Sequence, residues 1–366
     1  MPALVKKASI VTVGIALPDA SLAQLREVAD EVHYYPKGDA PADVLAKTQV
    51  YTCSRFGTPA SISDMAKQMP NLVLLQLPSA GADKVVEHTV IKKALANGAN
   101  FSVATASGVH AVSIPQYIVA TLLALYLRLP QQILVSQNEA RWAGGDEIAV
   151  GLENTGENDT AYYVRSLRGK TVGFLSYGHL ARAAAALLPA FGVKIIAANS
   201  NGKRRTDEGY HIPGTGDKDA ALPAEMYSTS DNASLDAFLS RCDVLVSSLP
   251  STPSTRGFLT RERLARLPKD AVLINVGRGD VIASEDLVWA CDRADGLWGA
   301  AIDVTEPEPL PAGHPLFKHP KIILTPHLSG DCQDELALGA SIMCYNVERL
   351  NTGKDPINLV SFGKGY

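Results

Sequence analysis

The chain has 366 residues and a formal net charge of −4, and its composition is 46% hydrophobic and 20% charged. This length is ample for two domains with separate cores, and this composition excludes an intrinsically disordered chain and a basic nucleic-acid surface. The five cysteines show no C-x-x-C spacing, so we expect buried thiols in a reducing compartment, with neither a disulfide framework nor a metal site.

The N-terminus, where Lys6 and Lys7 precede an apolar run that ends at Leu17, faintly resembles a secretory signal peptide. The residues from Pro18 onward, however, begin a helical pattern and not a cleavage site. We therefore interpret the run as a first buried strand and expect a cytoplasmic protein.

Segments typical of strands and helices alternate from residue 8 to about residue 105, which predicts a parallel sheet with helices on both faces. The expected strands are Ile10–Ala16, Glu31–Tyr35, Gln49–Cys53, Leu72–Leu77 and Asn100–Ala104, and the expected helices include Leu22–Val32 and Val85–Asn97. The turn from Pro78 to Asp83 follows one of these strands and could offer amides to a small anion, although an ordinary βα turn is an equally good interpretation.

Residues 111–142 show a different pattern. From Gln116 to Leu129 the chain is apolar nearly all round, which is typical of a buried helix that is too short to cross a membrane. Pro130 is expected to end it, and a second helix is expected from Gln131 to Trp142. We interpret this pair as the hinge side of a second domain and as a homodimer interface. Residues 144–166 are polar and indicate a loop.

A strand–helix–strand unit follows, with an apolar strand at Thr171–Leu175, a helix at Leu180–Leu188 and a second strand at Val193–Ala198. Such a unit presents helix N-terminal amides to a pyrophosphate. The glycine fingerprint between strand and helix is incomplete, because Ser176, Gly178 and Ala181 occupy its three positions. Alanine suits the third position, but the serine must make a tight turn without glycine's freedom. The surrounding unit favours cofactor binding over a plain α/β layer.

The polar stretch from Asn199 to about Thr229 is long for a loop and indicates a functional insertion. Regular alternation then returns, with strands at Asp243–Leu249, Ala271–Val276, Trp298–Val304 and Ile322–Thr325, and helices at Leu259–Leu267, Glu285–Arg293 and Asp331–Leu350. The last helix could return to the first domain.

Three of these strand ends deliver polar side chains: Arg278, the pair Glu306 and Glu308, and His327. Arginine binds a planar carboxylate through two hydrogen bonds. Histidine can transfer a proton near neutral pH, and a carboxylate behind it fixes its tautomer. Each residue alone is more often an ordinary surface residue, but their shared placement after strands of one sheet favours a common site.

The chain contains Leu167–Gly173, Leu273–Gly279, Ala301–Pro311 and Leu324–His327, and more loosely matching segments at Ser79–Asp83 and Gly108–Ala111. In these segments it resembles the D-2-hydroxyacid dehydrogenase family, which includes glyoxylate/hydroxypyruvate reductases. The resemblance implies an α/β fold with two Rossmann-like or flavodoxin-like domains, parallel sheets and an interdomain cleft. Residues 1–109 and 331–366 would form the substrate-binding domain and residues 110–330 the dinucleotide-binding domain. The implied reaction is reversible reduction of a small 2-keto acid to a D-2-hydroxy acid.

Carried over position by position, the resemblance implies Arg278 as the residue that binds the substrate carboxylate and carbonyl. It implies His327 as the acid/base, with Glu308 rather than Glu306 as its partner. The amides of Ser79, Ala80 and Gly81 would also hold the carboxylate. The implied cofactor site comprises Tyr177, Gly178, His179 and Leu180 at the pyrophosphate, Leu249, Pro250 and Thr255 at the adenosine, Val276, Gly277 and Asp303 at the nicotinamide, and Gly330.

Asn199 stands where NAD-dependent members carry an acid that repels a 2′-phosphate, and Ser200, Lys203, Arg204 and Arg205 follow it. We therefore expect NADP(H) to be preferred, with NAD(H) possible. A solvated basic loop is the alternative, and it would leave the enzyme indifferent between the two cofactors.

Substrate specificity is expected to depend on residues 51–56, where Arg55 could pair with a second anionic group, and on Trp142 of a partner subunit. A protein with this fold could instead be a dinucleotide-sensing, partner-binding module.

Overall fold

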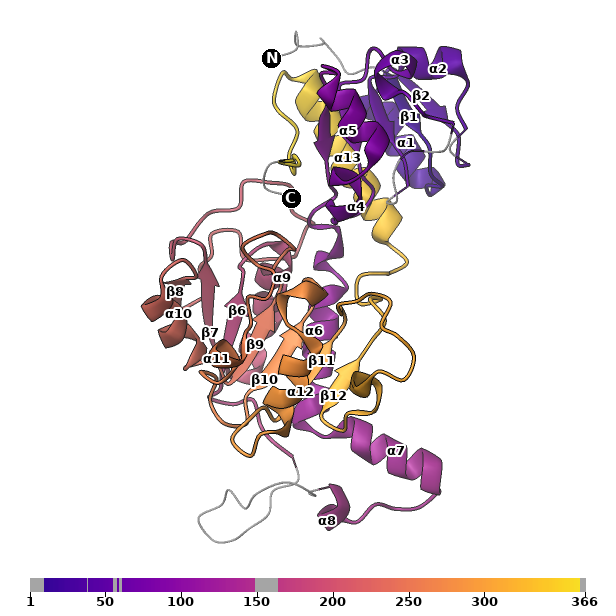
Figure 1. The fold of residues 1–366 in the computed structure, drawn as a ribbon. Helices are drawn as coiled ribbons and strands as arrows, with labels where there is room; N and C mark the ends of the chain where they lie inside the picture. Colours follow the sequence, from indigo (N-terminus) through magenta and orange to yellow (C-terminus); the bar gives the residue numbers. More distant parts are fainter. Residues whose placement is uncertain (1–9, 38, 55–57, 59–60, 149–163, 363–366) are drawn as a thin grey trace. The chain divides into compact units, whose positions relative to one another are not determined.

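The structure is a computed structural model that describes residues 10–37, 39–54, 58, 61–148 and 164–362, so Arg55 lies outside the described residues. The chain divides into two compact units (Figure 1). The first unit comprises Met1–His110, Glu208–Gly214 and Asp331–Tyr366, and the second comprises Ala111–Asp207 and Thr215–Gly330.

The first unit contains a five-stranded, wholly parallel sheet in the order β2-β1-β3-β4-β5. Its elements are β1 (Ile10–Val13), α1 (Asp19–Val28), β2 (Glu31–Tyr34), α2 (Ala42–Lys47), β3 (Val50–Thr52), α3 (Met65–Gln68), β4 (Leu74–Gln76), α4 (Asp83–Val86), α5 (Thr89–Ala96), β5 (Ser102–Ala104), η1 (Val109–Ala111) and α13 (Glu335–Asn351).

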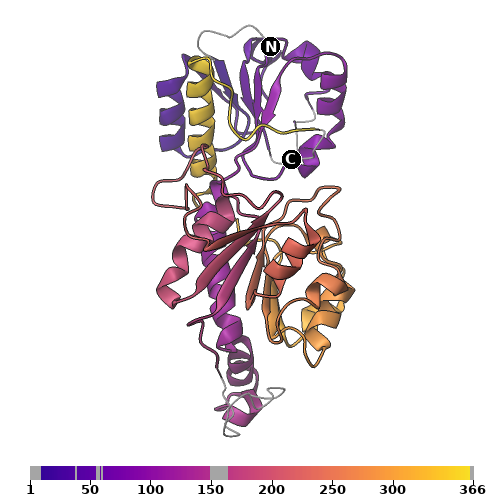
Figure 2. The ribbon, with the colours of Figure 1, turned by 90° about the vertical axis from the view of Figure 1, so that its left-hand side faces the viewer.

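Apolar layers cover both faces of this sheet. On one face α1 and α13 lie side by side (Figure 2) and bury Leu25 and Val347. On the other face α3 and α5 bury Met65 and Ile91. A buried hydrogen bond of 2.8 Å from Asn346 Nδ2 to Gln76 Oε1 ties α13 to β4, and it satisfies two polar groups that would otherwise be costly to bury. The last long helix of the chain is therefore built into the first unit.

The second unit contains a seven-stranded parallel sheet in the order β12-β11-β10-β9-β6-β7-β8. Its elements are α6 (Ile114–Tyr126), α7 (Leu129–Glu139), α8 (Gly145–Ile148), β6 (Thr171–Leu175), α9 (His179–Leu187), η2 (Pro189–Phe191), β7 (Lys194–Asn199), β8 (Glu225–Ser228), α10 (Asn232–Leu239), β9 (Val244–Ser247), α11 (Arg261–Leu264), β10 (Val272–Asn275), η3 (Gly279–Val281), α12 (Ser284–Asp292), β11 (Gly299–Ile302), η4 (Pro315–Lys318) and β12 (Ile322–Leu324). The prediction of two α/β domains with parallel sheets is confirmed.

Strand order reverses between β6 and β9, because β7 and β8 lie on one side of β6 and β9 to β12 lie on the other. Ligands of open α/β sheets bind beyond the carboxyl ends of the strands at such a reversal. The incomplete glycine fingerprint follows β6 and therefore lies at this position.

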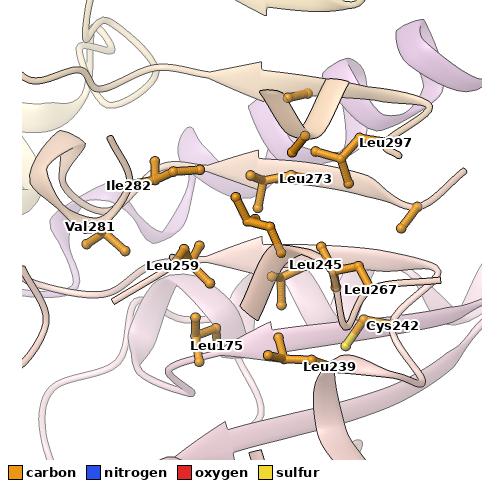
Figure 3. Packing of buried hydrophobic residues seen from close by; sticks show 14 of the residues in the cluster. Leu175, Leu239, Cys242, Leu245, Leu259, Leu267, Leu273, Val281, Ile282 and Leu297 are labelled. Atoms are coloured by element: carbon orange, nitrogen blue, oxygen red, sulfur yellow. The ribbon is translucent and has the colours of Figure 1, made fainter. Parts of the chain in front are cut away.

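Two apolar layers sandwich the second sheet. Figure 3 shows one of them, where Leu175, Leu245 and Leu273 from three neighbouring strands pack near Leu239 and Leu297. All five side chains are buried, and each such burial contributes about 1.5–3 kcal/mol. On the opposite face α6 and α9 pack against each other and against the strands. These layers fix the strand ends from which the polar residues project.

Helix α6 buries seven of its thirteen residues, so it is buried along one face and not all round. The break that follows it also differs from the expected one. The chain turns at Arg128, whose φ is 52°, and Pro130 lies in the first turn of α7. A proline is tolerated there because its missing N–H has no intrahelical acceptor to lose. Among the described residues no single helix is long and apolar enough to span a membrane, and the pair α6 and α7, which reaches that length together, is bent by 72°.

The polar stretch after β7 contains strand β8, and helix α10 follows it; the sequence revealed neither element. Strand β8 pairs with β7 alone. It has only four residues, which is too short for a recognisable alternation of apolar and polar residues. Helix α10 begins after Asp231, whose side chain accepts a hydrogen bond of 2.8 Å from the Ser234 amide. Residues 208–214 belong to the first unit, whereas the sequence assigned them to the second domain. Within the first unit the Tyr210 ring packs 5.6 Å from that of Tyr345.

Candidate active site

Arg278 lies in a turn at the carboxyl end of β10 that the buried Asn275 shapes. The Gly277 amide donates to Asn275 Oδ1 over 3.2 Å, and Asn275 Nδ2 donates to the Arg278 carbonyl over 3.0 Å. Both the oxygen and the nitrogen of this fully buried carboxamide therefore form hydrogen bonds within the turn. The turn has one conformation because breaking it would leave those buried groups unpaired.

The glycines on either side of Arg278 allow two neighbouring strand ends to approach it. A Cβ on Gly277 would come within 2.4 Å of the Leu249 carbonyl oxygen, and one on Gly279 within 2.0 Å of the Thr305 carbonyl carbon. Only glycine leaves room for these contacts. The G-R-G sequence thus packs the arginine turn between the segments that follow β9 and β11.

His327 follows β12, which neighbours β11 and β10 in the sheet. Its φ of 56° is in the left-handed region, a conformation that costs about 1–3 kcal/mol outside glycine and persists only where the surroundings impose it. The surroundings here include Asp303, at the end of β11. The Leu328 and Ser329 amides each donate to the Asp303 carboxylate over 3.1 Å, directly after the histidine.

Both oxygens of Asp303 are used in this way. Asp303 is only 2% exposed, and its carboxylate also accepts hydrogen bonds from Thr325 Oγ1, over 2.6 Å, and from Ser329 Oγ. Four protein donors therefore hold it beneath the histidine turn. The expectation that Asp303 lies near a nicotinamide carboxamide stays a prediction, and the structure adds that both of its carboxylate oxygens already accept hydrogen bonds from this turn.

The structure pairs His327 with Glu308 and not with Glu306. Nδ1 of His327 lies 2.6 Å from Oε1 of Glu308, and the two side chains are 44% and 42% exposed. A carboxylate can only accept, so the bond places the Nδ1 proton toward Glu308 and leaves Nε2 directed to other partners. Arg278, Glu308 and His327 thus follow three consecutive strands of one sheet, and two of them are in direct contact.

The fingerprint turn after β6 has the geometry of an anion site. Ser176 occupies the first glycine position with a φ of 78°, which glycine adopts freely and serine adopts with strain. Gly178 caps α9, and a Cβ there would meet no atom within 4 Å. Its φ of −91° suits any residue. The open space beside Gly178 leaves room for a group such as a pyrophosphate to approach the first amides of α9 closely.

Tyr177, in the same turn, is fixed by residues that the sequence analysis did not identify. Its hydroxyl donates to Asp217 Oδ2 over 2.7 Å. Arg182 of α9 is 3% exposed, stacks 5.2 Å from the Tyr177 ring and donates to the carbonyls of Asp217 and Arg205. The sequence did contain one signal for this network, which is an arginine within the alanine- and leucine-rich helix α9. If such an arginine is buried, its guanidinium requires hydrogen-bond acceptors nearby. This network joins the fingerprint turn to the segment after β7.

The end of β7 forms a compact turn around Asn199. Its Oδ1 accepts from the amides of Asn201 and Gly202, and its Nδ2 donates to the Lys203 carbonyl over 2.8 Å. The Lys203 side chain is exposed. Asn199 thus organises the turn, and its expected role at the cofactor ribose stays a prediction.

Arg204 has a different environment from the expected one. Its guanidinium donates to the carbonyls of Ala220, Pro223 and Ala224. This use anchors the segment that leads into β8, so the expected contact of Arg204 with a phosphate is not supported. Arg205 is exposed, and its carbonyl is held by Arg182. His179, the first residue of α9, has Nε2 3.1 Å from Oδ2 of Asp207.

The remaining expected cofactor residues lie at strand ends of the second unit. Thr255 Oγ1 donates to the Pro250 carbonyl over 2.5 Å and closes the turn that follows Leu249. Val276 is buried beside Gly277, Leu180 packs against the layer under α9, and the Gly330 carbonyl accepts from Ser113 Oγ.

The turn at Ser79–Gly81 lies at the carboxyl end of β4 in the first unit. The Ser79 carbonyl accepts a hydrogen bond of 2.9 Å from the Ala106 amide, which holds the turn against the segment after β5. Within the part of the chain that the structure describes, no acceptor bonds the amides of Ser79, Ala80 or Gly81. These amides are available to an anionic group.

Comparisons with known proteins bear on the family of this chain. The protein-family model described as "D-isomer specific 2-hydroxyacid dehydrogenase, NAD binding domain" matches residues 121–329. A glyoxylate reductase from Thermofilum pendens is 27% identical over 356 residues, which is 94% of this chain and 92% of that protein.

Two solved structures have the same fold. A D-isomer specific 2-hydroxyacid dehydrogenase from Xanthobacter autotrophicus, in complex with NADPH and MES, has a TM-score of 0.69 at 22% identity, over 98% of this chain and 100% of that one. An NADPH-dependent glyoxylate/hydroxypyruvate reductase from Sinorhizobium meliloti, in complex with NADP and sulfate, has a TM-score of 0.68 at 23% identity, with the same coverage. Because the family pattern covers more than half of the chain, the protein belongs to the D-isomer specific 2-hydroxyacid dehydrogenases, a family of NAD(P)-dependent oxidoreductases.

Proposed function

We propose that the protein reduces a small 2-keto acid to a D-2-hydroxy acid, reversibly, and that it prefers NADPH. The observation that carries this proposal is the His327–Glu308 pair, which follows strands adjacent to the one that delivers Arg278. A protein that only senses a dinucleotide needs no proton donor of this kind. The pair therefore favours a dehydrogenase over the partner-binding alternative.

His327 is proposed to transfer the proton. Because Glu308 accepts from Nδ1, the Nε2 atom presents the second proton of the imidazolium to the carbonyl oxygen of the substrate. Glu308 also stabilises the charged imidazolium before the proton leaves. A bound nicotinamide cofactor supplies the hydride for the carbonyl carbon. In the oxidative direction neutral His327 accepts the hydroxyl proton.

Arg278 is proposed to bind the substrate carboxylate and to polarise its carbonyl, with the amides of Ser79, Ala80 and Gly81 as further carboxylate donors. A guanidinium in a rigid turn holds a planar carboxylate in one orientation. Orientation of this kind contributes much of an enzymatic rate acceleration, because it replaces a chance encounter by a fixed geometry.

The NADPH preference rests on the turn after β7. Asn199 contributes no negative charge, and its hydrogen bonds hold Lys203 on the exposed side of the turn. We assign the 2′-phosphate to Ser200, Lys203 and Arg205, in place of Arg204, whose guanidinium is committed to backbone carbonyls. Cationic and hydroxyl donors of this kind bind a phosphate through charge-assisted hydrogen bonds.

One experiment tests the function directly. The protein is mixed with NADPH or NADH and a panel of 2-keto acids, and the nicotinamide absorbance is followed. We expect consumption of NADPH with at least one small keto acid and the D-enantiomer as product. The matched control is His327→Gln, which should bind cofactor normally and turn over slowly. Tight cofactor binding with no turnover across the panel would instead favour a dinucleotide-sensing module.

We also propose a homodimer built on the 111–142 region. Helix α7 buries none of its residues, and it exposes Leu129, Ile133 and Leu134, while Trp142 beyond it is 96% exposed. Exposed apolar residues gathered on one helix mark an interaction surface. Ile133→Glu together with Leu134→Glu should convert a dimer to monomers in analytical ultracentrifugation.

The five free cysteines, four of them buried, support our proposal of a cytoplasmic location.

A further inference from the structure

A chain of hydrogen bonds within the second unit links α6 to the turn that carries His327. The hydroxyl of Tyr117, on α6, lies 2.8 Å from Thr325 Oγ1. Thr325 Oγ1 lies 2.6 Å from Oδ1 of Asp303. The direction of the chain is determined, because a carboxylate only accepts and threonine has a single hydroxyl proton. Thr325 therefore donates to Asp303, and Tyr117 must donate to Thr325.

Tyr117 is suited to remain a donor. Burial raises the pKa of its phenol to about 12, and the charge of Asp303 acts in the same direction, against the opposing effect of the Thr325 hydrogen bond. The hydroxyl is therefore protonated throughout the neutral range. A donor at this point also keeps the Thr325 hydroxyl oriented toward the carboxylate.

The carboxylate at the end of this chain holds the histidine turn on both sides. Thr325 lies two residues before His327, and the Leu328 and Ser329 amides lie directly after it, and all three donate to Asp303. The left-handed backbone of His327 depends on such restraints. Helix α6 contacts the far end of the same segment, because Ser113 Oγ donates to the Gly330 carbonyl over 3.3 Å.

We propose that Tyr117 and Thr325 are positioning residues for the reaction, which fix the His327 turn through Asp303. This inference rests on the proposed role of His327 as the proton donor. The Glu308 contact fixes the imidazole ring of His327, and the chain from Tyr117 fixes the backbone from which that ring projects. Substrate and cofactor do not need to touch either hydroxyl for the effect to operate.

The experiment compares Tyr117→Phe with a matched control, Tyr126→Phe. Tyr126 lies on the same helix and is fully buried, and its hydroxyl has no hydrogen-bond partner among the described residues. In Tyr117→Phe we expect kcat to fall roughly five- to tenfold, the scale of one hydrogen bond, with the KM for NADPH within about twofold of the wild type. Tyr126→Phe should retain wild-type kinetics. Thr325→Ser keeps the hydroxyl and should retain most activity, whereas Thr325→Val should resemble Tyr117→Phe.

A second readout does not depend on turnover. The ring proton and nitrogen signals of His327 are recorded by NMR in the protein without cofactor or substrate. Tyr117→Phe should shift or broaden these signals, and Tyr126→Phe should leave them unchanged. Unchanged His327 signals together with unchanged kcat in Tyr117→Phe would overturn the proposal. Shifted signals in a protein that reduces no keto acid would support the positioning chain and count against the proposed function.

Discussion

Nδ1 of His327 lies 2.6 Å from Oε1 of Glu308, although the two residues are nineteen positions apart and follow different strands. Adjacent parallel strands bring their carboxyl ends to one edge of the sheet, so β11 and β12 deliver the two side chains to the same place. The contact depends on a histidine backbone that Asp303 restrains. The site thus forms only because the segments after three neighbouring strands lie at the same edge of the sheet.

Glu308→Gln and Glu308→Ala separate the two contributions of this carboxylate. Glutamine can still accept from Nδ1 through its carbonyl oxygen but carries no charge, whereas alanine does neither. We expect kcat to fall about tenfold in the glutamine variant and further in the alanine variant, in line with general acid catalysis that contributes about 10²–10⁴-fold in total. Initial rates of keto-acid reduction provide the measurement. Equal activity of all three proteins would remove Glu308 from the mechanism.

Arg278→Ala is expected to lower kcat/KM for the keto acid by about 100-fold, because one charged, bidentate contact contributes about 1.5–3 kcal/mol and orientation is lost with it. Arg278→Lys retains the charge without the fork geometry and should recover only part of the activity. Cofactor affinity, measured by nicotinamide fluorescence, should change little in either variant. A variant that loses cofactor affinity as well would indicate a collapsed turn, and thermal unfolding distinguishes that case.

The sequence predicted the architecture well because parallel α/β sheets leave strong apolar periodicities. The fingerprint strand, helix and second strand were expected within a few residues of β6, α9 and β7. The choice of Glu308 over Glu306 also agrees with the contact in the structure, but it came from the family resemblance. Two glutamates separated by one proline cannot be distinguished by residue type alone.

Other features depend on contacts that no local pattern reveals. Lys203 and Arg204 are adjacent cations and both are exposed, yet the Arg204 guanidinium also donates to three backbone carbonyls. Asp303 was expected at a cofactor, but its burial and its four donors are consequences of how β11 and the His327 turn pack. Burial of a polar group is a tertiary property, and the identity of its partners is known only from the fold.

Ser176→Gly tests the strain in the fingerprint turn. The φ of 78° suits glycine better than serine, by about 1–2 kcal/mol, and the greater freedom of glycine in the unfolded chain offsets about half of that. We therefore expect the free energy of unfolding in urea to rise by up to about 1 kcal/mol. The control is Gly178→Ala, which meets no protein atom within 4 Å. It should leave stability almost unchanged and weaken cofactor binding. A destabilised Ser176→Gly protein would mean that the serine side chain supports the turn.

The cofactor prediction separates three neighbouring cations by their environments. Lys203, Arg204 and Arg205 are all exposed, but the Arg204 guanidinium donates to the carbonyls of Ala220, Pro223 and Ala224. Replacing Lys203 and Arg205 by alanine should raise the KM for NADPH about ten- to 100-fold, since each charge-assisted bond to a phosphate contributes about 1.5–3 kcal/mol. The KM for NADH should change little, and the effect should shrink as salt is added.

Arg204→Ala should behave differently from the other two variants. It removes the side-chain donor to three carbonyls, so we expect a lower free energy of unfolding, by about 1 kcal/mol, and similar losses with NADPH and NADH. Steady-state kinetics with both cofactors, together with urea unfolding of each variant, distinguish the two roles. If Arg204→Ala selectively impaired NADPH and the Lys203 and Arg205 variants did not, the assignment of the phosphate contacts would be wrong. If the wild type used NADH as efficiently as NADPH, the turn after β7 would be no more than a solvated basic loop, because a 2′-phosphate would then gain nothing from it.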